Sequence, residues 1–374
     1  MAMIERALFV TGVQRSGTTL LEKLLGAQKS ISMLSQPFPL LFTDVKRDFL
    51  GGDDAYPLGH LFLESRYEPE QFAAFLGNWR TTAEELEPIF ARMEHYSGQC
   101  TRFSADERRK AFSQIASTDD FAAVVSTLDR ALAHKDANWF GSKETICEEY
   151  VPPLLDRGFH CTIILRDPRD FVTSLNHGRG NQYGGARKPT LFNIRTWRKS
   201  VAIALAMKGH PRFHHCRYED LVTDTAPELE RLAAAFGLEA MTVPSEVRDA
   251  SGNPWRGNSS HADYEGISPA SVGIYREILH ATVAEFVEAA CLPELQFLGY
   301  PTSQTRTGAI RVLQAFTEPY SGIRGGMEQD TITPENIDFE IRRLERVPAS
   351  IDDESRRWFL FPQTHTQLRE GFRP

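Results

Sequence analysis

The sequence lacks the features that would commit it to several common classes of protein. It contains five cysteines in 374 residues, and no two of them form a Cys-x-x-Cys pair. Neither a zinc site nor a thioredoxin-like redox centre is therefore predicted. Scattered cysteines in odd number favour a reducing compartment over a disulfide framework. The apolar run at residues 7–10 is too short to cross a bilayer, so no membrane span is expected.

A secretory signal and an excess of positive charge are also missing. No basic patch followed by an apolar region begins the chain, and we therefore expect a protein that works in the cytoplasm. The net charge of −8 argues against a broad electrostatic contact with nucleic acid or with an anionic membrane. An anionic ligand can still bind where a few cations converge. The hydrophobic content of 41% is enough for a sizeable core.

Short apolar runs alternate with helical patterns along most of the chain. Strands are predicted at residues 7–11, 31–34, 139–143, 161–165 and 213–218. Helices are predicted from residue 18 and at residues 121–134, 151–157, 171–177 and 193–207. The alternation predicts an α/β fold of three layers, in which helices cover both faces of a mostly parallel sheet.

Two segments depart from this alternation. The strand signal fades between about residues 38 and 138, where residues 70–80 and 82–95 read as half-polar helices. This predicts a helical cap inserted into a domain that spans residues 1–300. Residues 301–374 have weak periodicity, and we expect them to form a C-terminal extension of unknown role.

A glycine-rich loop joins the first predicted strand to the first predicted helix. Residues 12–19 read Gly-Val-Gln-Arg-Ser-Gly-Thr-Thr, and a loop in this place directs backbone N–H groups at one anion. The glycine spacing is that of a nucleotide-triphosphate loop, but Thr18 stands where such a loop has lysine, and the cation is Arg15. The loop predicts a sheet of the P-loop nucleotide-binding type but disfavours ATP chemistry. A plain strand-to-helix turn, the alternative, would not need so many donors.

This loop resembles the 5′-phosphosulfate loop of the sulfotransferase superfamily, especially in the tyrosylprotein and bacterial branches, where arginine replaces lysine. The resemblance implies that the co-substrate is 3′-phosphoadenosine 5′-phosphosulfate (PAPS). It also implies that Arg15, with the amides and hydroxyls of Ser16, Gly17, Thr18 and Thr19, holds the 5′-phosphate and the sulfuryl group.

A second motif, Arg-Asp-Pro-Arg-Asp, occupies residues 166–170 at the end of a predicted strand. Asp167 can cap the following helix and Pro168 suits its first position, which places Ser174 about two turns along it. Taken alone, Arg166 and Ser174 read as surface residues. Their separation, however, is that of the 3′-phosphate pair in sulfotransferases, so the resemblance implies that both bind the 3′-phosphate.

Two further segments extend the resemblance over roughly residues 7–300. Residues 218–221 read Tyr-Glu-Asp-Leu, similar to an element of the family, which implies that Tyr218 contacts the adenine or the side of the 3′-phosphate. Residues 258–260 resemble part of the bacterial members, and Ser259 and Ser260 are expected to contact a phosphate or the acceptor.

Transfer of a sulfuryl group requires charge stabilisation at the leaving phosphate. Arg15 is the expected electrophilic partner, because its charge is permanent and it can bond two oxygens. Lys143 ends a predicted strand at the place where relatives carry a lysine near the sulfuryl group. A solvated surface amine is the alternative interpretation of Lys143.

The reaction also requires a base for the acceptor's proton. Gln36 and Thr145 stand where relatives carry a glutamate or a histidine, and neither is an ordinary base. Glu144 is the carboxylate closest to the expected centre, although it reads equally as the ion-pair partner of Lys143. His60 and Glu148 are the alternative bases.

The predicted function is sulfuryl transfer from PAPS to a hydroxyl or amine of a small-molecule or glycan-like acceptor. The product is then 3′-phosphoadenosine 5′-phosphate (PAP), and no metal is required. A P-loop kinase or hydrolase is one alternative, which would need a lysine at position 18. A catalytically inactive nucleotide-binding protein is another. The positive charge of residues 176–188 favours an anionic or sugar-like acceptor, and a solvated loop explains it as well.

Overall fold

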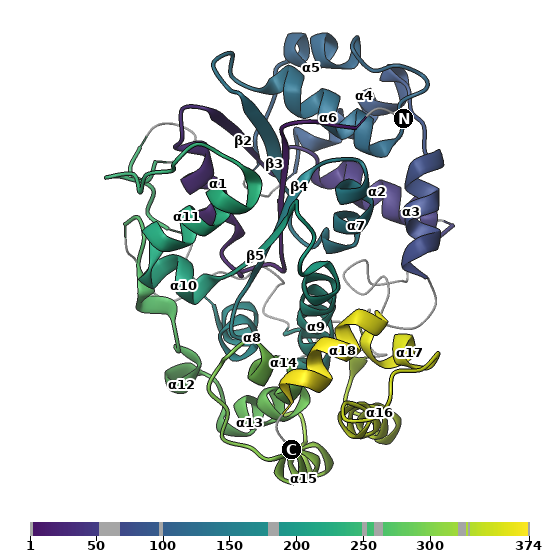
Figure 1. Cartoon of the computed structure of the whole chain (residues 1–374), viewed down its shortest axis with the longest axis vertical. Helices are drawn as coiled ribbons and strands as arrows, with labels where there is room; N and C mark the ends of the chain where they lie inside the picture. Colours follow the sequence, from purple (N-terminus) through teal and green to yellow (C-terminus); the bar gives the residue numbers. More distant parts are fainter. Residues whose placement is uncertain are drawn as a thin grey trace.

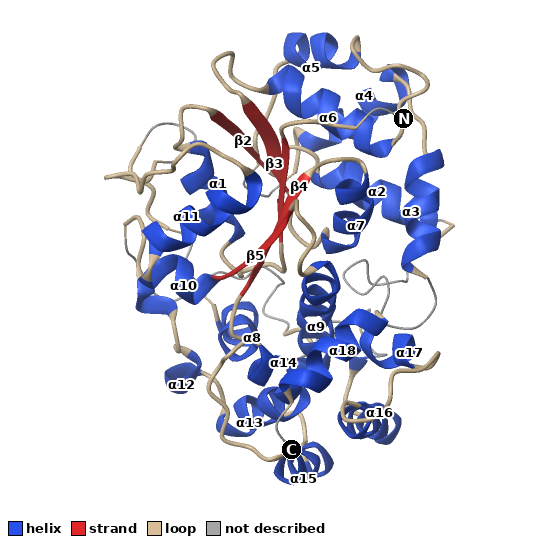
Figure 2. Cartoon of the chain, in the orientation of Figure 1, coloured by secondary structure: helices blue, strands red, loops and turns tan. Residues whose placement is uncertain are grey.

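A parallel sheet organises the chain. The computed structural model describes residues 3–51, 68–96, 100–178, 187–248, 253–257, 265–320, 327 and 330–372. Within these ranges the sheet has five strands in the order β2-β3-β1-β4-β5 (Figure 2). They are β1 (Ala7–Thr11), β2 (Ile31–Ser35), β3 (Trp139–Lys143), β4 (His160–Leu165) and β5 (Phe213–Arg217). The predicted α/β fold is confirmed, except that the last strand ends at Arg217 because Tyr218 opens a helix.

The strand order brings the sequence motifs to one edge of the sheet. β1 pairs with β3 on one side and β4 on the other, so that Val10 lies opposite both Lys143 and Thr162. All pairs are parallel, and the carboxyl ends of the strands therefore face the same way. Ligands of open parallel sheets bind outside these ends.

Helices cover both faces, and the alternation of side chains along β1 shows why. Leu8 and Val10 point into a cluster with α1 (Thr18–Gly26), α10 (Tyr218–Thr223) and α11 (Thr225–Phe236). Ala7 and Phe9 point into the larger cluster on the other face, with α7 (Val151–Asp156), α8 (Pro168–His177) and α9 (Thr190–Met207). Figure 1 shows the two helical layers on opposite sides of the strands. Such two-sided burial is what near-continuous apolar strands require.

The helical segment predicted between residues 38 and 138 supplies part of one layer. It contains α2 (Pro39–Phe49), α3 (Pro69–Asn78), α4 (Ala83–Met93), α5 (Ala105–Phe112) and α6 (Phe121–Leu132). Phe42 of α2 stacks on Phe9 of the sheet with ring centroids 5.6 Å apart. Capping boxes begin α4 at Thr82 and α5 at Ser104. These helices are thus continuous with the main core.

The C-terminal region packs on the same body. It consists of α12 (Tyr275–Ile278), α13 (Ala281–Ala290), α14 (Leu292–Phe297), α15 (Arg306–Ala315), α16 (Pro334–Arg346), α17 (Ser355–Phe359) and α18 (Pro362–Gly371). α18 lies against α9 and α14, and Glu340 of α16 forms buried ion pairs with Arg195 and Arg198 of α9. Over the residues described, no helix combines the length and apolarity needed to cross a bilayer.

Candidate active site

The loop between β1 and α1 has a conformation that only certain residues allow. Gly17 caps α1 with φ +104°, and a Cβ atom added there would lie 2.5 Å from a ring carbon of Tyr218. Arg15, two residues earlier, is also left-handed, with φ +67°. The Oγ of Ser16 donates to the Val13 carbonyl at 2.7 Å and closes the loop. Alternation of left- and right-handed residues turns successive N–H groups toward one side, which forms a concave anion site.

The two sequence motifs meet at this loop. Arg15 Nε donates to Ser174 Oγ at 3.1 Å, and Arg166 Nη1 donates to the Arg15 carbonyl at the same distance. The Arg166 guanidinium lies over the Tyr218 ring, 4.5 Å from its centroid. Arg15, Arg166, Ser174 and Tyr218 therefore form one cluster. Arg166 Nε is buried and has no hydrogen-bond partner in the described part of the chain, so a charged donor remains for an anionic ligand.

Lys143 lies at the carboxyl end of β3 and is buried rather than solvated, with 1% of its surface exposed. Its Nζ donates to Gln36 Oε1 at 3.0 Å, and the Gln36 backbone N–H donates to the Lys143 carbonyl at 2.8 Å. Gln36 adopts φ +43° to make both contacts. Burial lowers the pKa of Lys143, and the charges of Glu22 and Glu144 oppose this.

Glu144 is fully enclosed beside Lys143. One carboxylate oxygen accepts from the Phe38 N–H at 2.7 Å, and the other is buried with no hydrogen-bond partner among the described residues. Burial raises the pKa of Glu144 to about 8, although the Phe38 N–H and Lys143 act in the opposite direction. Within 4 Å, the described residues show no ion pair between Lys143 and Glu144; the carboxylate is directed at the N-terminus of α2 instead.

Glu148, one of the alternative bases, has a different environment. Glu148 is fully buried against Lys199 of α9, with 3.4 Å between the charged groups. His60, Ser259 and Ser260 fall outside the residues that the structure describes, and their predicted roles stay predictions.

A cavity of about 230 Å³ opens beside the phosphate loop. Gln14 of the loop, Gln36 after β2 and Thr145 after β3 all line it. The two positions at which relatives carry their base thus share one cavity wall. Its other lining residues are Pro39, Phe42, Thr43, Lys46, Tyr96, Ile146 and Cys147. Its place at the carboxyl ends of β1, β2 and β3 makes it the candidate acceptor site.

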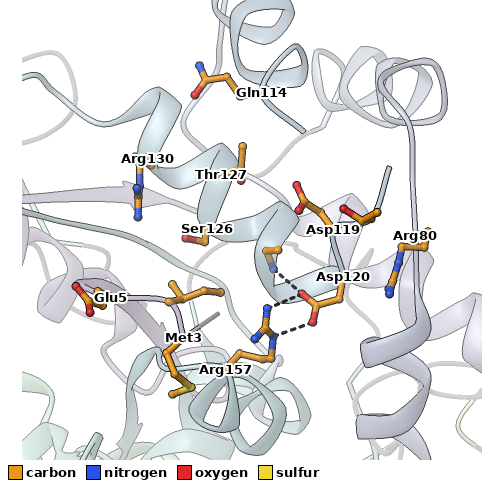
Figure 3. A pocket seen from close by; sticks show the side chains of 13 residues that line it. Met3, Glu5, Arg80, Gln114, Asp119, Asp120, Ser126, Thr127, Arg130 and Arg157 are labelled. Atoms are coloured by element: carbon orange, nitrogen blue, oxygen red, sulfur yellow. Dashed lines mark hydrogen bonds and ion pairs between the residues drawn. The ribbon is translucent and has the colours of Figure 1, made fainter. Parts of the chain in front are cut away.

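A second and wider hollow, of about 810 Å³, lies at the opposite end of β1 (Figure 3). Met3, Glu5, Arg80 and Arg130 are among the residues that line it. Its central charges pair with each other, since Arg157 Nε donates to Asp120 at 2.7 Å. Of the predicted site residues that the structure describes, none lines this hollow. The carboxyl ends of the strands, where the described site residues gather, are therefore the candidate site.

Comparison with known families agrees with this geometry. A family model described as "Sulfotransferase family" matches residues 7–242, which include the phosphate loop, Gln36, Lys143, Arg166 and Tyr218. The chain belongs to the sulfotransferase family. The resemblance predicted from the two motifs is confirmed, and the protein is an enzyme of this family.

Solved structures similar to this sulfotransferase include two sulfotransferase domains and retinol dehydratase. The sulfotransferase domain from the curacin biosynthetic pathway is 15% identical, with a TM-score of 0.45 over 81% of this chain and 100% of that one. The sulfotransferase domain of the Synechococcus PCC 7002 olefin synthase is also 15% identical, with a TM-score of 0.44 over 85% and 98%. Retinol dehydratase, in complex with androsterone and inactive cofactor PAP, is 16% identical, with a TM-score of 0.39 over 82% and 84%. A search of curated proteins finds no match.

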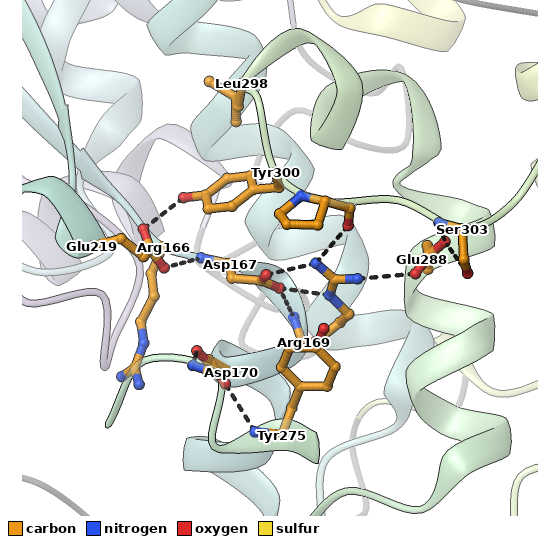
Figure 4. Close-up of polar contacts among 12 residues, drawn as sticks. Arg166, Asp167, Arg169, Asp170, Glu219, Tyr275, Glu288, Leu298, Tyr300 and Ser303 are labelled. Carbon is orange, nitrogen blue, oxygen red and sulfur yellow. Dashed lines mark hydrogen bonds and ion pairs between the residues drawn. The ribbon is translucent and has the colours of Figure 1, made fainter. Parts of the chain in front are cut away.

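The side chains that hold Arg166 in this sulfotransferase carry no recognisable motif. Trp197 Nε1 on α9 donates to the Arg166 carbonyl at 2.7 Å, and Arg166 Nη2 donates to the Ser271 carbonyl at 2.5 Å. Glu219 accepts from the Asp167 N–H and from the Tyr300 hydroxyl, both at 2.9 Å (Figure 4). The partners of Glu219 are distant in sequence, so no local pattern predicts its bracing role.

Asp170 completes this support. Its carboxylate accepts from the Gly273 N–H at 2.6 Å and the Tyr275 N–H at 2.9 Å (Figure 4). The contacts bring the segment that carries Ser271 against α8, where it meets Arg166. The sequence contains Asp170 within the Arg-Asp-Pro-Arg-Asp run, but it does not reveal which backbone groups this carboxylate binds.

Proposed function

We propose that this sulfotransferase takes PAPS as its donor and transfers the sulfuryl group to a hydroxyl or amine of a small-molecule or glycan-like acceptor. PAP is the second product. The proposal rests on one cluster beside the phosphate loop, in which the side chains of Arg15, Ser174, Arg166 and Tyr218 meet. Two residues of this loop, Arg15 and Gly17, have left-handed backbone conformations. Two anion-binding elements side by side suit a nucleotide that carries phosphate at both its 5′ and 3′ ends.

The residues divide between the two ends of the donor. The loop amides and the hydroxyls of Thr18 and Thr19 hold the 5′-phosphate, at the N-terminus of α1 where the helix dipole favours an anion. Arg166, with its buried unpartnered Nε, and Ser174 hold the 3′-phosphate. Tyr218, against which Arg166 stacks, forms the wall next to the adenosine.

In the transfer step the acceptor oxygen or nitrogen forms a bond to sulfur while the bond from sulfur to the 5′-phosphate oxygen breaks. Arg15 and Lys143 stabilise the charge that develops on the leaving oxygen, because a fixed cation in a buried site costs no reorganisation as charge appears. Glu144 in its ionised form accepts the acceptor's proton. It adjoins Thr145 in the sequence, which lines the cavity.

The decisive experiment offers the enzyme PAPS labelled with ³⁵S in the sulfuryl group and a panel of phenols, alcohols, sugars and amines. Label in an acceptor establishes the reaction. Binding of PAP without transfer to any acceptor would favour an inactive nucleotide-binding protein. Transfer of phosphate from ATP with Mg²⁺ would favour a kinase and contradict the proposal. We place this chemistry in the cytoplasm, because scattered cysteines in odd number favour a reducing compartment.

A further inference from the structure

The amide of Gln36 is oriented by the lysine beside it. Lys143 Nζ lies 3.0 Å from Gln36 Oε1, and an ammonium has only donors, so the atom that faces it is the amide oxygen. The Gln36 backbone N–H donates to the Lys143 carbonyl at 2.8 Å, which joins the two residues at a second point. The NH₂ group of the Gln36 side chain therefore points away from Lys143, and it can only donate.

This NH₂ group is open to the candidate acceptor cavity, which Gln36 lines. Gln36 Nε2 has no hydrogen-bond partner among the described residues, and it is not one of the atoms that are buried there without a partner. An amide N–H that the protein neither bonds nor buries must be met by an oxygen of the ligand or by water. Gln36 thus presents a donor at the place where the acceptor binds.

The charge of Lys143 decides this orientation, because a neutral amine could accept from the amide instead. Burial lowers the pKa of Lys143, while the carboxylates of Glu22 and Glu144 favour the ammonium. PAPS, bound as proposed, adds the negative charge of its sulfuryl group and 5′-phosphate next to Lys143, and a nearby opposite charge stabilises the charged form. Lys143 is therefore an ammonium when the acceptor enters, and the amide of Gln36 keeps its orientation.

The described lining of the cavity contains no carboxylate. Its one charged residue is Lys46, whose Nζ donates to the Ile146 carbonyl at 2.7 Å and to Glu149 at 3.0 Å. The Glu149 side chain is fully buried and is not part of the lining. The hydroxyl of Thr145 can donate or accept, so it does not distinguish one kind of ligand from another. A ligand in this cavity thus meets the cation of Lys46 and the amide donor of Gln36, with no anion to oppose them.

A hydroxyl and an amine differ in how they meet such a donor. A hydroxyl oxygen has two lone pairs, so one can attack sulfur while the other accepts from Gln36 Nε2. A neutral amine has a single lone pair, and its attack on sulfur leaves nothing for the amide to bond. The attacking nitrogen also gains positive charge near Lys46 and Lys143, whereas an oxygen becomes more negative as the base removes its proton. Both effects favour oxygen as the nucleophile.

We propose that this enzyme sulfates hydroxyl groups rather than amines, and that Gln36 determines this specificity by donating from Nε2 to the attacking oxygen. The inference rests on the proposed function, in which either nucleophile is allowed. In the transfer step the oxygen forms a bond to sulfur and its proton passes to Glu144. The bond from sulfur to the 5′-phosphate oxygen breaks, and PAP leaves with the electron pair. The product is a sulfate ester.

4-Aminophenol tests the inference within one molecule, because its hydroxyl and its amino group lie at opposite ends of the same ring. The products formed with PAPS are separated by chromatography and identified by NMR as the O-sulfate or the N-sulfamate. We expect the O-sulfate in about 10- to 100-fold excess, the range that follows when the alternative leaves a donor unsatisfied, although the amine is the stronger nucleophile in water. The N-sulfamate as the main product would overturn the inference.

Substitution of Gln36 identifies the responsible group. Gln36→Met keeps the length of the side chain without its donor, and it should lower the ratio of O-sulfate to N-sulfamate by about 10- to 100-fold. Thr145→Val, in the same cavity, should keep the ratio even where the rate falls. Gln114→Met, beside the hollow at the opposite end of β1, is the matched control and should keep both. A ratio that is unchanged in Gln36→Met, or that falls equally in Thr145→Val, would overturn the role of the amide.

Binding gives a second readout that does not require turnover. In the enzyme–PAP complex, 4-nitrophenol should bind about 10- to 100-fold more tightly than 4-nitroaniline, whose nitrogen is a poor acceptor, and Gln36→Met should remove this difference. Equal affinities in the parent enzyme would overturn the inference and leave the sulfotransferase reaction intact. Failure of PAP to bind the parent enzyme would instead refute the proposed donor. Each variant is first checked for PAP affinity, which also shows that it has folded.

Discussion

Arg15 Nε donates a hydrogen bond to Ser174 Oγ over 3.1 Å, across 159 positions of the sequence. The contact joins the phosphate loop to helix α8, and Arg166 strengthens the junction through its bond to the Arg15 carbonyl. The residues expected at the 5′ and 3′ ends of the donor are thus in one hydrogen-bonded cluster. The effects of substitutions at the 5′ and 3′ ends can be distinguished only with pairs of ligands that differ by one phosphate.

PAP should stabilise the protein against thermal unfolding without Mg²⁺. At 100 times its dissociation constant, a ligand specific for the folded state adds about 2.7 kcal/mol to the free energy of unfolding. Differential scanning fluorimetry with PAP, with and without EDTA, measures the effect. A shift in Tm with ATP and Mg²⁺ but none with PAP would contradict the assignment of the loop.

Arg166→Ala and Ser174→Ala should weaken PAP binding, with the larger loss at Arg166. Removal of a bond between a charged donor and a phosphate costs about 1.5–3 kcal/mol, or roughly 10- to 100-fold in Kd. Affinity for 5′-AMP, which has no 3′-phosphate, should change little. The measurement is calorimetric titration with both nucleotides, and an equal loss for the two would show that these residues do not bind the 3′-phosphate. Arg92→Ala, on an exposed face of the cap, is the control.

Arg15→Ala should lower kcat by roughly two to three orders of magnitude, as expected for loss of a donor that acts on the transition state. Affinity for PAP should fall less, because the loop amides and Thr18 and Thr19 remain. Arg15→Lys should recover part of the rate, since it restores a cation. Steady-state kinetics and PAP titration on the same preparations test the split between kcat and affinity. Normal turnover of Arg15→Ala would refute the proposed role.

The pH dependence of the rate should follow Glu144, whose pKa burial raises to about 8. A base must be ionised, so kcat should rise with pH and level off above about 8. Glu144→Gln should abolish this rise together with most of the activity. A pH–rate profile of the parent that is flat between 6 and 9, or an active Glu144→Gln, would exclude Glu144 as the base.

Ionisation of Glu144 should also affect the stability of the fold, which should fall with rising pH while kcat rises. A raised pKa in the folded state means that the fold prefers the neutral acid, so this stabilisation is complete below the unfolded value near 4.5 and is lost as the pH rises through about 8. Glu144→Gln should therefore gain stability relative to the parent between pH 5 and pH 9. Chemical denaturation at these two pH values measures the difference.

Gly17→Ala should impair both folding and donor binding. Its Cβ would lie 2.5 Å from the Tyr218 ring at a φ of +104°. Gly209→Ala is the matched control, because its φ is +90° but nothing lies within 4 Å of the added atom. Both variants should lose about 1–2 kcal/mol to backbone strain. Gly17→Ala should lose more, and its PAP affinity should fall as well. Equal losses would show that the approach of Tyr218 has no energetic consequence.

The sequence by itself predicts the five strands, most of the helices and the two phosphate motifs. These features depend on interactions over a few residues. Short continuous apolar runs favour a strand buried on both faces, Asp167 and Pro168 begin a helix at the place expected, and the loop glycines permit left-handed backbone. Each can be recognised without knowledge of what lies opposite.

Only the tertiary structure decides which of these features face one another. The strand order places β3 between β2 and β1, and for this reason Lys143 meets Gln36 and Gln14 shares a cavity with Thr145. The burial of Glu144, which governs its pKa, arises from the N-terminus of α2, 106 positions away in the sequence. Contacts of this kind depend on side-chain packing and on solvent exclusion between distant segments, neither of which leaves a periodic pattern in the local sequence.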